Sequence, residues 1–109
     1  ADPRHHITVA IERGTVIGML TAVEYFHPDK PVELWINEVG VAPDFQRAGV
    51  GSRLIEMMLD HGRKLGCREA WVLTEKDNAA ANGLYRSTGG NEEDVVLYSY
   101  DLGAVPDGQ

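Results

Sequence analysis

The sequence predicts an α/β fold (α+β, with one mixed sheet), and three observations carry this prediction. Segments 7–12, 16–26 and 32–41 show the period-two alternation of apolar residues that is typical of strands. Segment 51–65 has the periodicity of an amphipathic helix, and the apolar segment at 69–74 is typical of a buried strand. With a second helix and a last strand, the expected order is β-β-β-α-β-α-β, antiparallel at the start with a parallel crossover in the middle.

Turn-forming residues separate the first three strands. Arg13-Gly14 joins the first two as a hairpin, and the segment 27–31 forms a loop because its two prolines cannot join a ladder. Strand alternation predicts that the third strand places Leu34, Ile36 and Glu38 on one face. Its other face would then carry Trp35, Asn37 and Val39.

The two helices are marked by their ends. Leu54, Met58 and Leu65 form the apolar stripe of the first helix, and Gly66 ends it. Asn78 is the expected cap of a second helix at 79–87, which ends at Gly89-Gly90. Segment 95–102 alternates again and is predicted as the final strand. We therefore expect a single domain over 1–109, with flexible ends at 1–6 and 103–109.

The composition disfavours several classes of partner. The net charge of −7 would repel nucleic acid and attract a cation, although an acidic balance is also common simply because it favours solubility. No apolar run is long enough to span a membrane, and the first six residues do not resemble a signal peptide. The single Cys67 cannot form an internal disulfide, which favours a cytoplasmic protein. His5 and His6 lack a third ligand nearby in the sequence, so no metal site is expected.

Segment 46–52 lies between the third strand and the first helix. Gly49 and Gly51 can leave backbone N–H groups open at a helix N-terminus, which favours a phosphate or pyrophosphate. The alternative is that these glycines only permit a tight entry into the helix. A Walker loop would need a lysine where Ser52 stands, and a dinucleotide fingerprint a third glycine where Leu54 stands.

Two motifs carry a family resemblance. Gln46-x-x-Gly49-x-Gly51 matches the pyrophosphate motif, and 78–90 the Asn…Ala…Leu-Tyr…Gly segment, of the GNAT superfamily of acetyl-CoA-dependent N-acetyltransferases. The resemblance spans 7–102. Within the superfamily the chain most resembles the gentamicin-type aminoglycoside N-acetyltransferases, through the acid in 36–41 and the segment 90–102. The family's initial strand and two helices are missing from the predicted core, because only 1–6 precede the first strand.

The resemblance implies a site for each part of the reaction. The cofactor would bind to backbone groups of Val39 and Val41 and near Asn78. Its pyrophosphate would bind the loop residues Gln46, Arg47, Ala48, Gly49, Val50, Gly51 and Ser52. Glu38 is the candidate base, because desolvation among apolar strand residues would raise its proton affinity; the alternative is an ion pair with Arg47. Tyr85 is the candidate acid for the leaving thiolate and also lies at the cofactor; the alternative is a tyrosine that only packs in the core.

The expected function is transfer of an acetyl group from acetyl-CoA to a primary amine of a small cationic acceptor, such as an aminoglycoside. Two alternatives remain open, which are a CoA-binding domain without catalysis and a protein or peptide N-acetyltransferase. A homodimer is also expected, because a sheet without the family's first helices would leave apolar surface uncovered.

Overall fold

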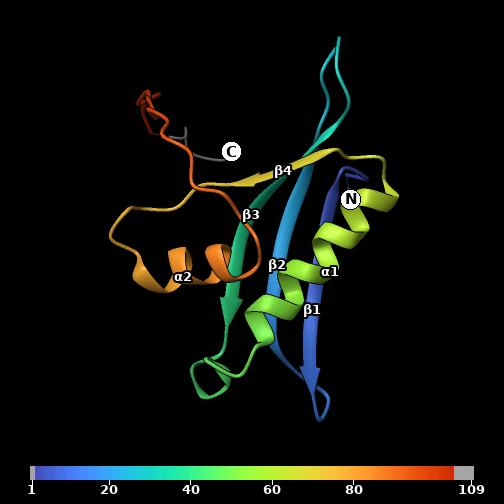
Figure 1. Ribbon diagram of the computed structural model, residues 1–109, viewed down its shortest axis with the longest axis vertical. Coiled ribbons are helices and arrows are strands. Elements are labelled where there is room, and N and C mark those ends of the chain that lie inside the picture. Colours follow the sequence, from blue (N-terminus) through green and yellow to red (C-terminus); the bar gives the residue numbers. More distant parts are fainter. Residues whose placement is uncertain (1, 105–109) are drawn as a thin grey trace.

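The computed structural model describes residues 2–104, which form a four-stranded mixed sheet with two helices (Figure 1). The elements in chain order are β1 (His5–Glu12), β2 (Thr15–Tyr25), β3 (Glu33–Val41), the short 3₁₀ helix η1 (Pro43–Phe45), α1 (Val50–Lys64), β4 (Glu69–Val72) and α2 (Ala79–Ser87). The sheet order is β1-β2-β3-β4, antiparallel between the first three strands and parallel between β3 and β4. The predicted mixed sheet with a parallel crossover is confirmed.

The β1–β2 hairpin turns at the predicted dipeptide. Arg13 and Gly14 both have positive φ, 49° and 80°, as a two-residue turn that matches the twist of the strands requires. β1 begins at His5, two residues earlier than predicted, so His5 and His6 belong to the sheet and not to a flexible end. Residues 1 and 105–109 of the two expected flexible ends lie outside the described residues.

A bulge in β3 overturns the predicted faces of this strand. Thr21 pairs with Glu38 and Ala22 with Ile36, so Asn37 is the extra residue. Beyond the bulge the alternation is inverted: Val39 packs against the core, and Glu38 lies on the opposite face of the sheet from Ile36. The prediction that Glu38 shares the face of Leu34 and Ile36 is therefore wrong, because strict alternation does not anticipate an added residue.

β3 and β4 pair only at one end. Their ladder joins 33–36 to 69–72, and β4 ends at Val72, not at Thr74 as predicted. Beyond Ile36, β3 continues to Val41 paired with β2 alone. Within residues 2–104 no strand pairs with the other side of 37–41. The carbonyl of Val41 accepts a hydrogen bond from the Gln46 side chain there, and the remaining backbone groups are open to another extended chain.

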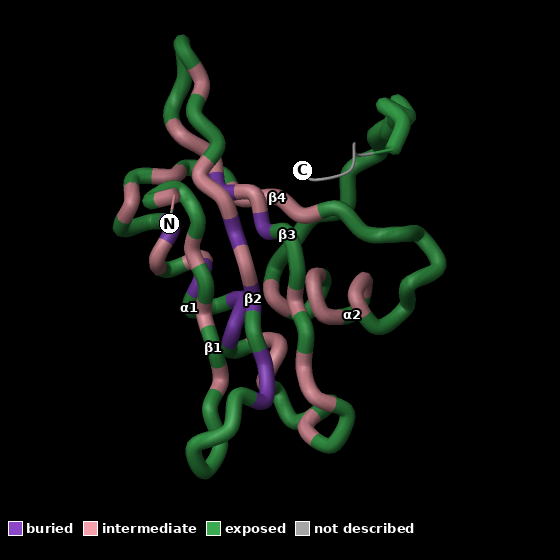
Figure 2. Tube along the Cα trace, turned by 180° about the vertical axis from the view of Figure 1, so that it is seen from behind, coloured by how far each residue is buried: buried purple, intermediate pink, exposed green. Residues whose placement is uncertain are grey.

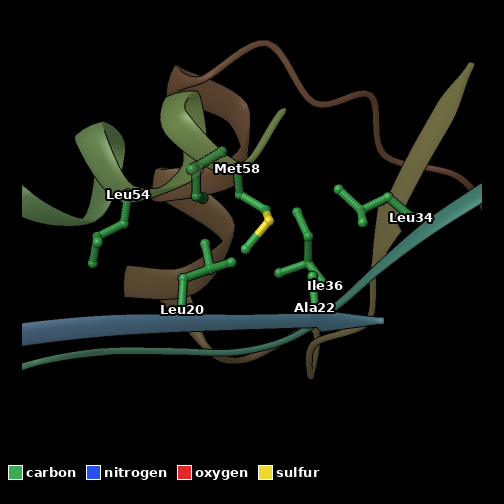
Figure 3. Packing of buried hydrophobic residues seen from close by; sticks show 7 residues of the cluster. Leu20, Ala22, Leu34, Ile36, Leu54 and Met58 are labelled. Atoms are coloured by element: carbon green, nitrogen blue, oxygen red, sulfur yellow. The ribbon is translucent and has the colours of Figure 1, made fainter. Parts of the chain in front are cut away.

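The core lies between α1 and the sheet. Leu54 and Met58 of α1 face Leu20 of β2 and Leu34 and Ile36 of β3 (Figure 3). Burying each of these side chains contributes about 1.5–3 kcal/mol. α2 packs against the edge of the same cluster through Leu84 and Tyr85, so both helices lie on one face of the sheet.

Both helices end in the same hydrogen-bonded motif. Gly66 (φ 91°) follows α1, and the N–H of Cys67 donates to the carbonyl of Gly62. Gly89 (φ 96°) follows α2, and the N–H of Gly90 donates to the carbonyl of Tyr85. A left-handed residue there needs glycine, which is why these glycines predict the helix ends correctly.

The face of the sheet opposite α1 and α2 is called the open face below. It carries apolar side chains of β1 and β2 that remain exposed to solvent: Ile7, Val9, Ile11 and Met19. Figure 2 shows that β1 has no buried residue along its length, whereas β2 beside it has several. No helix among residues 2–104 combines the length and the apolar character needed to cross a bilayer.

The predicted final strand is absent from the described structure. Residues 91–104 have no regular secondary structure, and all of them are exposed. The alternation of 95–102 is that of a strand, but no partner strand is in place among residues 2–104.

Candidate active site

A braced loop carries the chain from β3 into α1. The side-chain amide of Gln46 donates a hydrogen bond to the carbonyl of Val41, over 3.1 Å. Arg47 takes a positive φ of 63° and Gly49 one of 82°. Gln46 therefore holds the loop to the end of β3, which is a structural role beside the cofactor contact that the motif implies.

The N-terminus of α1 has no acceptor of its own. Gly49 is the N-cap, no side chain caps the helix, and its first turn contains no acidic residue. The N–H of Arg53 makes the first turn's bond, to the carbonyl of Gly49 over 3.1 Å. The amides of Val50, Gly51 and Ser52 precede that bond and have no partner within the helix. The positive end of the helix dipole is thus available to an anion.

The two glycines of the loop, Gly49 and Gly51, have different structural roles. Around Gly49 an added Cβ would meet nothing within 4 Å, so the space beside its amide is open. At Gly51 a Cβ would lie 3.3 Å from a methyl group of Leu84. Gly49 therefore fits the predicted anion cradle, whereas Gly51 also permits close packing of α1 on α2. Ala48 is exposed at the same loop.

Two asparagines order the segment between β4 and α2. The Asn78 side chain accepts the N–H of Ala81 over 3.1 Å, as predicted for a helix cap. Asn82 donates to the carbonyls of Glu75 and Asn78, over 3.0 and 2.8 Å. The side-chain oxygen of Asn78 accepts in the helix cap, its backbone N–H donates to the carbonyl of Glu75, and its own carbonyl accepts from Asn82. The side-chain N–H₂ of Asn78 is therefore the group that remains for a contact with cofactor.

Tyr85 lies on the helix face of the sheet, partly buried beside the core. Burial raises the pKa of its phenol, because the anion would lose hydration. The hydroxyl is therefore kept protonated at neutral pH, which is the form that a proton donor needs.

Glu38 lies on the open face and its side chain is exposed. The expected desolvation among Ile36, Val39 and Val41 is not found, because the bulge turns Glu38 away from the core. The alternative ion pair with Arg47 is also not among those formed by the described residues. Glu38 and Tyr85 thus lie on opposite faces of the sheet, on either side of the free edge of β3.

The sequence reasoning missed a tryptophan pair on the open face. Trp35 and Trp71 are directly paired between β3 and β4, and their rings stack with centroids 5.0 Å apart. The signal that could have found them is the parallel pairing of 32–41 with 69–74, which brings the two residues into register. The pair is in the last rungs before β3 and β4 part.

Glu33 lies on β3 next to the Trp35–Trp71 pair. Glu33 bonds with His27 over 2.9 Å, and this bond lowers the pKa of Glu33, with a smaller contribution from the Trp71 side chain. The rings of Tyr25 and His27 also contact each other, with centroids 4.7 Å apart and planes tilted by 53°. Strand register puts Glu33, Trp35 and Glu38 on the open face.

Three features follow one another along β3. Open amides for an anion lie at its C-terminal end, and a backbone edge with no strand beside it among residues 2–104 lies along 37–41. Glu33, Glu38 and the stacked Trp35 and Trp71 lie on the open face. No group of three or more His, Cys, Asp or Glu residues with metal-binding geometry occurs within residues 2–104.

Comparison with protein families gives a match over most of the chain. The model of the acetyltransferase (GNAT) family matches residues 1–89. The chain is 38% identical over 63 residues to the ribosomal protein bS18-alanine N-acetyltransferase of Escherichia coli K12, covering 58% of this chain and 43% of that protein. It is 33% identical over 89 residues to the N-alpha-acetyltransferase RimI of Mycobacterium tuberculosis, covering 82% and 54%. The chain thus spans about half the length of these curated relatives.

Solved structures share the fold. An aminoglycoside acetyltransferase from an uncultured soil metagenomic sample, meta-AAC0020 in complex with trehalose, superposes with a TM-score of 0.89 at 27% identity, covering 94% of this chain and 68% of that one. The aminoglycoside N-acetyltransferase AAC(6')-Iy in complex with CoA gives a TM-score of 0.81 at 25% identity, covering 94% and 79%.

Proposed function

Because this chain belongs to the acetyltransferase (GNAT) family, we propose that it transfers an acetyl group from acetyl-CoA to a primary amine of a small cationic acceptor. The observation that carries this proposal is the uncapped N-terminus of α1 behind Gly49, at the end of a strand whose edge is free. One element offers donors for a diphosphate and the other a backbone edge for an extended amide chain.

The cofactor contacts follow from these two features. The amides of Gly49 to Ser52 would bind the pyrophosphate, with Arg47 and Arg53 as nearby positive charges. The pantetheine arm would pair with the backbone of Val39 and Val41, as an added strand does. The solved complex of AAC(6')-Iy with CoA supports CoA as the carrier.

The reaction needs two proton transfers, and a side chain on each face of the sheet could carry out one of them. An alkyl ammonium has a pKa near 10, so its proton must be removed before the nitrogen attacks the thioester carbonyl. Glu38 would take this proton on the open face, directly or through a water. A backbone N–H of β3 would stabilise the oxyanion. Tyr85 would protonate the sulfur on the helix face as the carbon–sulfur bond breaks.

The open face favours a cationic acceptor. Glu33 and Glu38 lie on it on either side of Trp35, whose ring stacks on Trp71. Carboxylates and indole faces both attract ammonium groups, and the net charge of −7 acts in the same direction. The solved aminoglycoside acetyltransferases support an aminoglycoside as the acceptor.

A second candidate acceptor is a peptide N-terminus. The relative RimI, named as an N-alpha-acetyltransferase, aligns with 82% of this chain. The third candidate function is a CoA-binding domain without catalysis.

We further propose that the protein is a homodimer, because the open face keeps apolar side chains in solvent. We also propose that it is cytoplasmic, because Cys67 is a free thiol.

Release of free CoA thiol from acetyl-CoA tests the proposal and separates the three candidate functions. Panels of aminoglycosides, polyamines and peptides would be supplied as acceptors. Turnover with the first two panels supports a small cationic acceptor, and turnover with peptides alone supports the second candidate. Tight CoA binding without turnover on any amine would contradict the enzyme and favour the third candidate.

Two glycine variants test the cofactor cradle. Gly49→Asp should abolish CoA binding in calorimetry, because its carboxylate would stand where the pyrophosphate binds. Gly14→Asp is the matched control, since Gly14 has almost the same φ (80° against 82°) and equally open surroundings but lies in the hairpin turn. Both variants carry a similar backbone strain of about 1–2 kcal/mol, so equal CoA affinity of the two would contradict a phosphate site at α1.

A further inference from the structure

The segment between β4 and α2, residues 73–78, is exposed along its whole length. β4 lies on the side of β3 whose edge is unpaired beyond Ile36, and the segment continues from β4 to α2 on that side (Figure 1). It therefore lies next to the edge along which the cofactor is expected to bind. Because burial contributes little here, the conformation of the segment depends on its hydrogen bonds.

The side chain of Asn82 bonds to the backbone of this segment. Its Nδ2 donates to the carbonyl of Asn78 over 2.8 Å and to that of Glu75 over 3.0 Å, and it has a longer contact of 3.3 Å with the carbonyl of Lys76. A side-chain amide has two N–H bonds to donate, so the two shorter contacts use both. Asn82 thus ties residues 75–78 to the first turns of α2.

The position of α2 is itself fixed by the core. Leu84 and Tyr85 pack against the buried cluster, and a Cβ at Gly51 would lie 3.3 Å from a methyl group of Leu84. Residues three and four apart are neighbours on a helix, so Asn82 lies between Asn78 and Tyr85 along one side of α2. Its side chain therefore links an exposed segment to a helix that cannot easily move.

We propose that Asn82 is a positioning residue for the cofactor, a role that rests on the function proposed above. It would act through Asn78, whose carbonyl accepts both the main-chain and the side-chain N–H of Asn82. The backbone N–H and the side-chain oxygen of Asn78 are bonded to Glu75 and Ala81. The side-chain N–H₂ of Asn78 is then held in one orientation, and a donor that is already ordered loses less entropy when it binds a ligand.

Asn82→Ala tests this role in the full chain. Alanine has the highest helix propensity, so the substitution removes the side-chain bonds without weakening α2. In calorimetry CoA should bind about tenfold more weakly, the effect of losing about one net hydrogen bond. In thiol release the KM for acetyl-CoA should rise by a similar factor while kcat changes less than about twofold, because Glu38 and Tyr85 keep their places. A variant that was only partly folded would instead show a lower kcat at unchanged KM.

Ser87→Ala is the matched control. The Ser87 hydroxyl donates to the carbonyl of Leu84 over 2.9 Å, so this variant also loses a side-chain bond to the backbone of α2, but away from 75–78. It should keep the CoA affinity, KM and kcat of wild type. Wild-type CoA affinity in Asn82→Ala, or an equal loss in both variants, would overturn the role of Asn82.

Amide hydrogen exchange in the absence of CoA tests the positioning itself. In Asn82→Ala the amides of Asn78 and Ala81 should exchange about tenfold faster, because both bond to acceptors within 75–78 that Asn82 holds in place. Ser87→Ala should leave their exchange unchanged, and unchanged exchange in Asn82→Ala would contradict the proposal. A wild-type chain that does not bind CoA would contradict the proposed function, and the cofactor role of Asn82 with it.

Discussion

Glu38 owes its position to one extra residue in β3. Because Asn37 is inserted opposite Thr21 and Ala22, the carboxylate lies on the open face and not in the core. Burial therefore gives no support to the proposed role of Glu38 as the base. It would act by its position next to the free edge of β3, where a reacting amine and a thioester can meet.

Glu38→Gln should lower kcat by about 10²–10⁴-fold, the usual contribution of a positioned base, while leaving CoA affinity unchanged. The amide keeps the shape of the side chain but cannot take the proton. Steady-state thiol release and CoA calorimetry measure the two quantities. Glu56→Gln, on the exposed side of α1, is the control and should leave both unchanged.

Tyr85 differs from Glu38 because burial acts on it directly. Burial raises the pKa of Tyr85 above the ordinary value of about 10, so the phenol stays protonated at neutral pH. The neutral buried phenol stabilises the fold, and this contribution is lost only as the pH rises through the raised pKa. Tyr85→Phe should lower kcat at least about 10²-fold with little change in folding. In ultraviolet titration, the difference between wild type and variant should show one tyrosine ionising above pH 10; a difference at or below 10 would contradict this environment.

At the scale of elements, α1 packs against the sheet through one row of buried side chains. Met58 is fully buried and packs between β2 and β3, whereas its neighbour Met57 is 53% exposed. Met58→Ala should reduce the free energy of unfolding by about 2–5 kcal/mol, through lost burial and the cavity that remains. Met57→Ala should stay within about 0.5 kcal/mol. Urea denaturation measures both, and equal effects would contradict the packing in Figure 3.

Local signals explain which elements were predicted well. Gly66 and Gly89 end the helices because each takes a left-handed conformation, and Asn78 caps α2, so α1 starts within one residue of its prediction and α2 has its predicted bounds. Local signals do not predict the faces and partners of the strands. Neither the bulge at Asn37 nor the unpaired state of 95–102 is visible in alternation, because both depend on the neighbouring strand.

For the whole molecule, the Glu33–His27 contact predicts a contribution to acid stability. His27 lowers the pKa of Glu33 below its ordinary 4.5, so the stability from this carboxylate is present above that pH and is lost as pH falls through the lowered value. The unfolding free energy of Glu33→Gln should therefore fall less steeply in acid than that of wild type. Urea midpoints measured from pH 6 to pH 3 test this, and parallel curves would contradict it.

The sequence by itself determined the order of the described elements, the helix ends and the loop that opens at Gly49, because each depends on residues close together in the chain. Only the tertiary structure decided the face on which Glu38 lies, the pairing of Trp35 with Trp71, and the free edges of β3 and β4. These features arise between strands that are distant in sequence, and the energy of a strand pair is settled by its neighbours and not by its own pattern.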